Sequence, residues 1–262
     1  MKMGIVGAGA MGNAIIQGLF KDTAFAEMEL VICESDSEKR ASYLGQPQIT
    51  VTSKVSELST CNLILLAVKP GSVGEVLFQL HKFPAVLVVS VVAGVTLEQL
   101  AAGCGHPVVR VMPNTPALIG AGISAISYGN DISEEQKNQV EQIFSAVGKT
   151  RVVPESQLDA VTALSGCGPA YVYTMIEAMV DAGCAQGLPR EVAKELVVAT
   201  FLGASQMVAE SSEHPAQLRD KVTSPGGVTI SALHVLEQKG LRGILWDAVQ
   251  RACDTSKELQ KR

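Results

Sequence analysis

The segment Gly7-Ala8-Gly9-Ala10-Met11-Gly12 is the feature that most constrains how this chain folds. Its G-x-G-x-x-G spacing follows an apolar run, Lys2 to Val6, and precedes a predicted helix that reaches about Lys21. In this context the first glycine permits a tight turn, the second admits a pyrophosphate, and the third lets helix and strand pack closely. The helix N-terminus adds free N–H groups for phosphates. These six residues are therefore predicted to bind a dinucleotide.

Short apolar segments alternate with predicted helices over the first 153 residues, as in strand–helix–strand units. Helices are predicted over Ser37–Leu44 and Glu134–Val147. Strands are predicted over Lys2–Val6, Leu30–Cys33, Ile49–Val51, Leu63–Val68, Val86–Val92, Val108–Met112, Gly122–Tyr128 and Thr150–Val153. The sequence thus predicts an α/β dinucleotide-binding domain, residues 1–153, with a doubly wound, mostly parallel sheet of the Rossmann type.

After Pro154 the pattern changes to helices alone, separated by glycine and proline signals, and five or six helices are expected. Two of them, Ala170–Gln186 and Glu191–Ala209, are apolar nearly all round, which is typical of buried helices. That surface can be buried in a self-contained bundle or between subunits. We favour the second, an all-α domain over residues 154–262 that binds substrate and forms a homodimer.

Composition narrows the choice of partners. The net charge is −5 with no basic cluster, so nucleic acid is not expected. The longest apolar run, Val86–Val95, is interrupted by Ser90 and is about half the roughly 20 residues of a membrane span. No signal-peptide pattern opens the chain, so a cytoplasmic location without membrane contact is expected. Six cysteines and four histidines are dispersed, so no metal site is predicted.

The end of the second strand bears on the choice between NAD and NADP. Glu34 lies 22 residues beyond Gly12, where an acidic residue binds the ribose 2′-OH of NAD. Ser35, Lys39 and Arg40 follow, and hydroxyls and cations suit the 2′-phosphate of NADP. The two cations also fit a solvated helix face. These residues alone leave the preference open.

Other strand ends point to the same edge of the sheet, because ligands of open parallel sheets bind beyond the carboxyl ends of the strands. The residues predicted to contact the cofactor there are Ala67, Val68, Lys69 and Pro70 after one strand, Ala93, Gly94 and Val95 after another, and Asn114, beside Thr115, towards the nicotinamide. The turn Ser165–Pro169 either admits the nicotinamide face or packs helices, with equal weight.

A Ser-Pro-Gly-Gly turn opens a helix late in the chain. Its exposed N–H groups and hydroxyls form a nest suited to a small carboxylate. The predicted substrate-binding residues are Ser224, Gly226, Gly227, Val228 and Thr229. The alternative is a capped helix N-terminus with nothing bound.

The chain resembles the pyrroline-5-carboxylate reductase family from end to end. The resemblance rests on GAGAMG at 7–12, LAVKP at 66–70, MPNTP at 112–116, SGCGPAY at 165–171, LPR at 188–190 and HPAQLRDKVTSPGGVTISALHVLE at 214–237. It implies reduction of L-1-pyrroline-5-carboxylate to L-proline, usually with NADPH. It implies cofactor contacts from residues 8–11, 35, 67–70 and 93–95, and a carboxylate held by residues 224–229 with the catalytic Thr229 hydroxyl near the imine nitrogen. It also implies a dimer, often assembled into a pentamer of dimers.

The sequence departs from the family in three places. Lys54 stands where relatives often have Asn, Ser212 aligns with a Glu of some relatives, and Glu34 is acidic where a 2′-phosphate is expected nearby. Use of NADH as well as NADPH is therefore expected.

The sequence fits two other functions less well. Dehydrogenases of β-hydroxy acids carry a catalytic lysine in the first long helix of the second domain, whereas Tyr171–Gly187 contains none. A regulatory protein that binds a dinucleotide without turnover needs no carboxylate nest.

Overall fold

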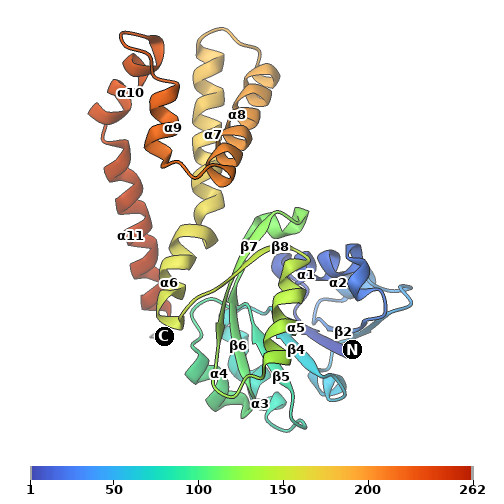
Figure 1. Ribbon diagram of the computed structural model, residues 1–262. Coiled ribbons are helices and arrows are strands. Elements are labelled where there is room, and N and C mark those ends of the chain that lie inside the picture. The colour runs from blue at the N-terminus through green and yellow to red at the C-terminus, as the bar shows by residue number, and fades with distance from the viewer. Residues whose placement is uncertain (1, 261–262) are drawn as a thin grey trace. The chain divides into compact units, whose positions relative to one another are not determined.

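A computed structural model describes residues 2–260 (Figure 1). The chain forms two compact units. The first runs to Cys167 and also takes in the C-terminal residues from Ala252 onward, and the second spans Gly168–Arg251. By compactness the chain thus divides after Cys167, whereas the predicted functional division follows Val153. The return of the C-terminus to the first unit had no signal in the hydrophobic pattern.

An eight-stranded sheet forms the centre of the first unit, in the order β3-β2-β1-β4-β5-β6-β7-β8. The strands are β1 (Lys2–Val6), β2 (Glu29–Cys33), β3 (Ile49–Thr52), β4 (Leu63–Leu66), β5 (Leu87–Ser90), β6 (Val108–Met112), β7 (Gly122–Tyr128) and β8 (Gly148–Val152). All neighbours pair in parallel except β6 and β7. The predicted mostly parallel, doubly wound sheet is confirmed.

Helices cover both faces of this sheet (Figure 1). One core cluster joins alternate strand residues to α1 (Ala10–Lys21) and α5 (Glu134–Ser145), and the other joins the remaining strand residues to α3 (Val73–Leu80) and α4 (Leu97–Cys104). Because side chains alternate along a strand, residues of β4 such as Leu65 and Leu66 enter opposite clusters. Strands buried on both faces explain the continuous apolar runs in the sequence.

Several element ends differ from the predictions. The strand predicted over Leu63–Val68 ends at Leu66, and the helix predicted over Ser37–Leu44, α2, ends at Ala41. The antiparallel direction of β7 was not predicted. Its connection from β6, residues 113–121, holds the short 3₁₀ turn η4 (Thr115–Ile119) and is shorter than the dozen or so residues of a parallel crossover.

Residues beyond β8 are helical, as expected. The first unit contains α6 (Leu158–Val161), the π turn η6 (Thr162–Gly166) and the end of α11 (Leu241–Leu259), and the second contains α7 (Gly168–Ala185), α8 (Arg190–Glu210), α9 (Pro215–Lys221), α10 (Val228–Gln238) and most of α11. Only Val180, Ala193 and Val197 form a buried cluster in the second unit. The expectation that α7 and α8 are buried therefore does not hold within one chain.

One helix of the described residues, α8, is long and apolar enough to cross a membrane by length and composition. This corrects the expectation that no segment reaches that length. A lone helix of this kind is weak evidence for a membrane protein.

Candidate dinucleotide site and substrate turn

The three glycines of the first turn have different surroundings. Gly7 has φ +95°, and a Cβ there would lie 2.6 Å from the carbonyl oxygen of Ala67. A Cβ at Gly12 would collide with the carbonyl oxygen of Gly7, whereas a Cβ at Gly9 would meet nothing within 4 Å. Gly7 and Gly12 are thus required by the packing of strand and helix. Gly9 faces open space at the start of α1, where no side chain caps the helix, and a pyrophosphate fits there.

The ends of four strands lie in register beside this turn. The N–H of Gly7 donates to the carbonyl of Cys33 (2.8 Å), the N–H of Ala67 to that of Val6 (2.8 Å), and the N–H of Val91 to that of Leu66 (3.0 Å). The sheet order changes direction between β1 and β4, and ligands of doubly wound sheets bind at such a switch point. The structure therefore brings the predicted residues 7–12, 35 and 67–70 to one edge.

The side chain of Glu34 is 8% exposed and holds the glycine turn. Its Oε2 accepts a hydrogen bond from the N–H of Ala8 (2.7 Å), and its Oε1 accepts from the N–H of Asp36 (3.0 Å) and the hydroxyl of Ser35 (3.2 Å). Burial raises the pKa of Glu34, but these hydrogen bonds and nearby Lys39 outweigh it and hold the pKa below its ordinary value. The carboxylate is thus engaged by the protein itself.

Cations lie close to the end of β2. Arg40 Nη1 donates to the carbonyl oxygens of Glu34 (2.6 Å) and Ser35 (2.7 Å), so it is tied to the backbone of the β2–α2 loop. Lys39 lines a cavity of about 480 Å³ together with Gly9 and other residues around the start of α1. Lys54 lines a second cavity, of about 440 Å³, that Gly7 and Ser35 also line. This set of hydroxyls and cations fits a ribose that carries a phosphate.

Asn114 follows β6 and begins η4. Its Oδ1 accepts a hydrogen bond from the N–H of Ile123 (3.0 Å), which ties the β6–β7 connection together. The role of Asn114 towards a nicotinamide stays a prediction. In the Ser165–Pro169 turn, a Cβ at Gly166 would lie 3.1 Å from Cε of Met112, the end of a flexible side chain that can move by a few tenths of an ångström.

The turn before α10 is exposed in the second unit. Gly226 has φ +68°, the N–H of Gly227 donates to the carbonyl of Ser224 (3.1 Å), and a Cβ at Gly227 would collide with Oγ of Ser224. Gly227 caps α10 without a side-chain hydrogen bond. Val228 is 89% exposed and Thr229 is half-buried. The positive φ favours glycine at 226, and Gly227 leaves room for the Ser224 hydroxyl, so the turn presents a hydroxyl beside helix N–H groups, as a carboxylate nest requires.

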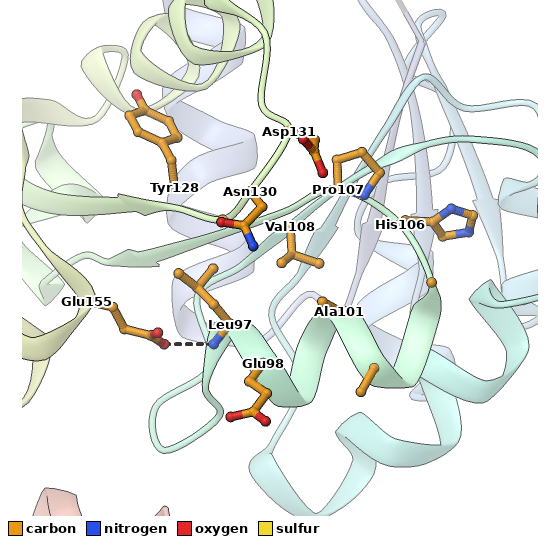
Figure 2. A pocket seen from close by; sticks show the side chains of 13 residues that line it. Leu97, Glu98, Ala101, His106, Pro107, Val108, Tyr128, Asn130, Asp131 and Glu155 are labelled. Atoms are coloured by element: carbon orange, nitrogen blue, oxygen red, sulfur yellow. Dashed lines mark hydrogen bonds between the residues drawn. The ribbon is translucent and has the colours of Figure 1, made fainter.

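A cavity of about 730 Å³ lies elsewhere in the first unit (Figure 2). In it, Oε1 of Glu155 accepts from the N–H of Leu97 (2.7 Å) and forms an ion pair with Arg110 (2.5 Å). None of the predicted site residues lines it. The ion pair ties the segment after β8 to β6, and the hydrogen bond ties it to the start of α4, so Glu155 has a structural role.

Two family models match the chain. The one described as pyrroline-5-carboxylate reductase dimerisation matches residues 155–259, and the one described as NADP oxidoreductase, coenzyme F420-dependent, matches residues 2–94. The match over residues 155–259 contains the exposed apolar helices of the second unit.

Relatives match over the whole length. A pyrroline-5-carboxylate reductase of Synechocystis is 41% identical over 100% of this chain and 99% of its own, and that of Escherichia coli is 37% identical over 99% and 98%. The crystal structure of the Plasmodium falciparum pyrroline carboxylate reductase with NADP bound has a TM-score of 0.88 at 32% identity, covering 99% of this chain and 98% of that one. The resemblance found in the sequence is confirmed, and this chain belongs to the pyrroline-5-carboxylate reductase family.

Proposed function

We propose that this chain reduces L-1-pyrroline-5-carboxylate to L-proline with NADPH. The observation that carries the proposal is the open space in front of Gly9 at the uncapped start of α1, in a chain that also presents the Ser224–Gly227 turn. Family membership supplies the substrate, since the relatives are named for it.

The proposed cofactor site is the carboxyl edge of the sheet. The turn Gly7–Gly12 offers helix N–H groups to the pyrophosphate, and Ser35, Lys39 and Arg40 lie towards the 2′-phosphate. Residues 67–70, 93–95 and 114 complete the proposed contacts. When bound, the nicotinamide supplies the hydride that reduces the imine carbon. Because Glu34 is engaged by Ala8 and Asp36, we expect NADPH to be preferred and NADH to be used more slowly.

The proposed substrate site is the turn before α10. The hydroxyl of Ser224 and the N–H groups of Gly226 and Val228 hold the substrate carboxylate, Gly227 closes the turn through its bond to the carbonyl of Ser224, and the hydroxyl of Thr229 hydrogen-bonds the imine nitrogen. A protonated imine is already electrophilic, so the chain needs no strong acid. Its contribution is to hold the reacting carbon in place, which lowers the barrier by several kcal/mol.

The substitution Thr229→Val tests the mechanism. It replaces the hydroxyl by a methyl of similar size, and we expect kcat to fall by much more than about tenfold. The assay is loss of absorbance by the reduced cofactor with L-1-pyrroline-5-carboxylate, run in parallel with NADPH and NADH. Thr229→Ser keeps the hydroxyl and is the matched control. A folded Thr229→Val enzyme with wild-type kcat excludes Thr229 from the mechanism. Absence of turnover by the folded wild-type protein overturns the proposed function.

The match to a dimerisation family supports a homo-oligomer. We propose residues 1–153 as the dinucleotide-binding domain and residues 154–262 as the substrate-binding and dimerisation domain, with dimers assembled into a pentamer of dimers in the cytoplasm, without metal, membrane or nucleic acid. Light scattering tests the assembly, because a pentamer of dimers has ten times the 27.5 kDa of one chain. A mass of two chains contradicts the pentamer and keeps the dimer.

A further inference from the structure

The last turn of α11 lies against the loop that follows β5. Gly94 in that loop has φ +79°. A Cβ added at Gly94 would have three nearest neighbours, all atoms of Leu259, at 3.4 Å (Cβ), 3.7 Å (C) and 3.8 Å (O). The residue that closes the C-terminal helix is therefore the nearest packing partner of this glycine outside its own loop.

The end of α11 also faces a second loop at the edge of the sheet where the dinucleotide is proposed to bind. Leu259 and Gln260 line a cavity of about 620 Å³ together with Pro70 and Gly71 after β4 and the Ala93–Val95 loop after β5. Both loops contain residues proposed to contact the cofactor. The end of the chain thus forms one wall of a space that they share.

Asp159 of α6 fixes the end of α11 in this place. Its Oδ1 accepts hydrogen bonds from the hydroxyl of Ser256 (2.7 Å) and from Nε2 of Gln260 (2.7 Å), one on each side of Leu259. Ser256 is buried, at 6% exposure. Figure 1 shows the C-terminal end of α11 beside α6. Hydrogen bonds to an ionised acceptor are stronger than neutral ones, so this pair of bonds sets the position of Leu259.

We propose that Leu259 is a positioning residue for the cofactor, held by Asp159 through Ser256 and Gln260. The last turn of α11 lies beside Gly94 through Cβ and the carbonyl group of Leu259, and it keeps the Ala93–Val95 loop in one conformation. A loop that is ordered before binding loses less conformational entropy when it binds. The inference rests on the proposed function, which assigns cofactor contacts to this loop.

The test is steady-state kinetics of Leu259→Gly, which removes the Cβ nearest Gly94, and of Asp159→Ala in the full-length enzyme, whereas Leu259→Ala keeps that Cβ and should match the wild type. For Leu259→Gly and Asp159→Ala we expect the KM for NADPH to rise roughly tenfold while kcat stays within about threefold, because the loop binds the cofactor and carries no reacting group. Titration of NADPH fluorescence should give a parallel rise in Kd. Asp159→Asn keeps an acceptor oxygen and should restore most of the affinity. Phe78→Ala, at a residue 66% exposed on α3, is the control and should leave the KM for NADPH unchanged.

The variant Gly94→Ala distinguishes a failure of this inference from a failure of the loop's proposed role in cofactor binding. If Gly94→Ala raises the KM for NADPH while Leu259→Gly and Asp159→Ala leave it at the wild-type value, the inference is overturned and the loop keeps its proposed role. If Gly94→Ala also leaves it unchanged, the role of the loop and the inference fail together. Should Asp159→Ala not fold, Leu259→Gly decides alone, since Leu259 is the last residue of α11 and is 46% exposed, so that its truncation leaves the folded core intact.

Discussion

The two units of this chain bury their apolar residues differently. In the first unit, two core clusters fill both faces of the sheet and many large side chains are fully buried. In the second unit the described core is Val180, Ala193 and Val197, while large side chains such as Leu202 and Trp246 are 67% and 80% exposed. The first unit thus has a core of its own. The second has apolar surface that a single chain does not cover, which is the pattern expected of a subunit interface.

Removing a large side chain from the core of the first unit should have the largest effect. Phe144 on α5 is fully buried. We expect Phe144→Ala to lower the free energy of unfolding by about 3–5 kcal/mol, because it leaves a cavity. Urea denaturation at two protein concentrations measures it, and the loss should be the same at both. Phe78→Ala, 66% exposed in the same unit, should cost about 0.5 kcal/mol or less. Equal losses for the two variants would contradict this account of the core.

A charge placed on the apolar surface of the second unit should weaken the association of subunits, and not the core of one chain. Leu202 on α8 and Leu44 in the first unit are 67% and 68% exposed. We expect Leu202→Glu to weaken dimerisation by roughly 2–4 kcal/mol, as for a central interface residue, and Leu44→Glu to leave it unchanged. Light scattering over a dilution series measures the difference. Dimers of undiminished stability for Leu202→Glu would remove α8 from the interface.

The same contrast explains what could be predicted from sequence. The runs Lys2–Val6 and Val108–Met112 coincide with β1 and β6 because strands buried on both faces are continuously apolar. The pattern gave no direction for β7, since alternation is the same in parallel and antiparallel strands. It predicted that α7 and α8 are buried, but a pattern of apolar residues does not distinguish burial within one chain from burial against a second subunit.

The candidate site shows a similar limit. The spacing of Gly7, Gly9 and Gly12 predicted their separate roles, because each role is a local steric requirement. The spacing left open whether Glu34 binds a ribose hydroxyl, and it gave no sign that the carboxylate accepts from Ala8, 26 residues earlier. The contact of Leu259 with Gly94 was not foreseen. Contacts between segments far apart in sequence follow from the tertiary fold and leave no periodic signal.

The glycine turn before α1 and the turn before α10 are proposed to bind different molecules, and their KM values can be measured separately. The Ser224 hydroxyl lies beside the N–H groups that open α10. We expect Ser224→Ala to raise the KM for L-1-pyrroline-5-carboxylate roughly tenfold, about 1.4 kcal/mol, because one hydrogen bond to the carboxylate is lost. The KM for NADPH is the internal control and should not change, since the cofactor is proposed to bind at the other turn. A rise in the KM for NADPH alone would contradict the assignment.

The smallest expected effect is on stability, at Glu34, because its charge holds the first of these turns. Its pKa lies below the ordinary value of 4.5, so the carboxylate stabilises the folded state above that pH, and the contribution is lost as pH falls through the folded pKa. Glu34→Gln keeps one acceptor oxygen and removes the charge, and we expect a loss of about 1 kcal/mol at pH 7. Urea denaturation from pH 7 downward should show the wild-type and Glu34→Gln proteins converging below pH 4.5. A gap that stays constant with pH would mean that packing, and not the charge, sets the contribution of Glu34. The first unit would then depend on its core alone, in sharper contrast to the second.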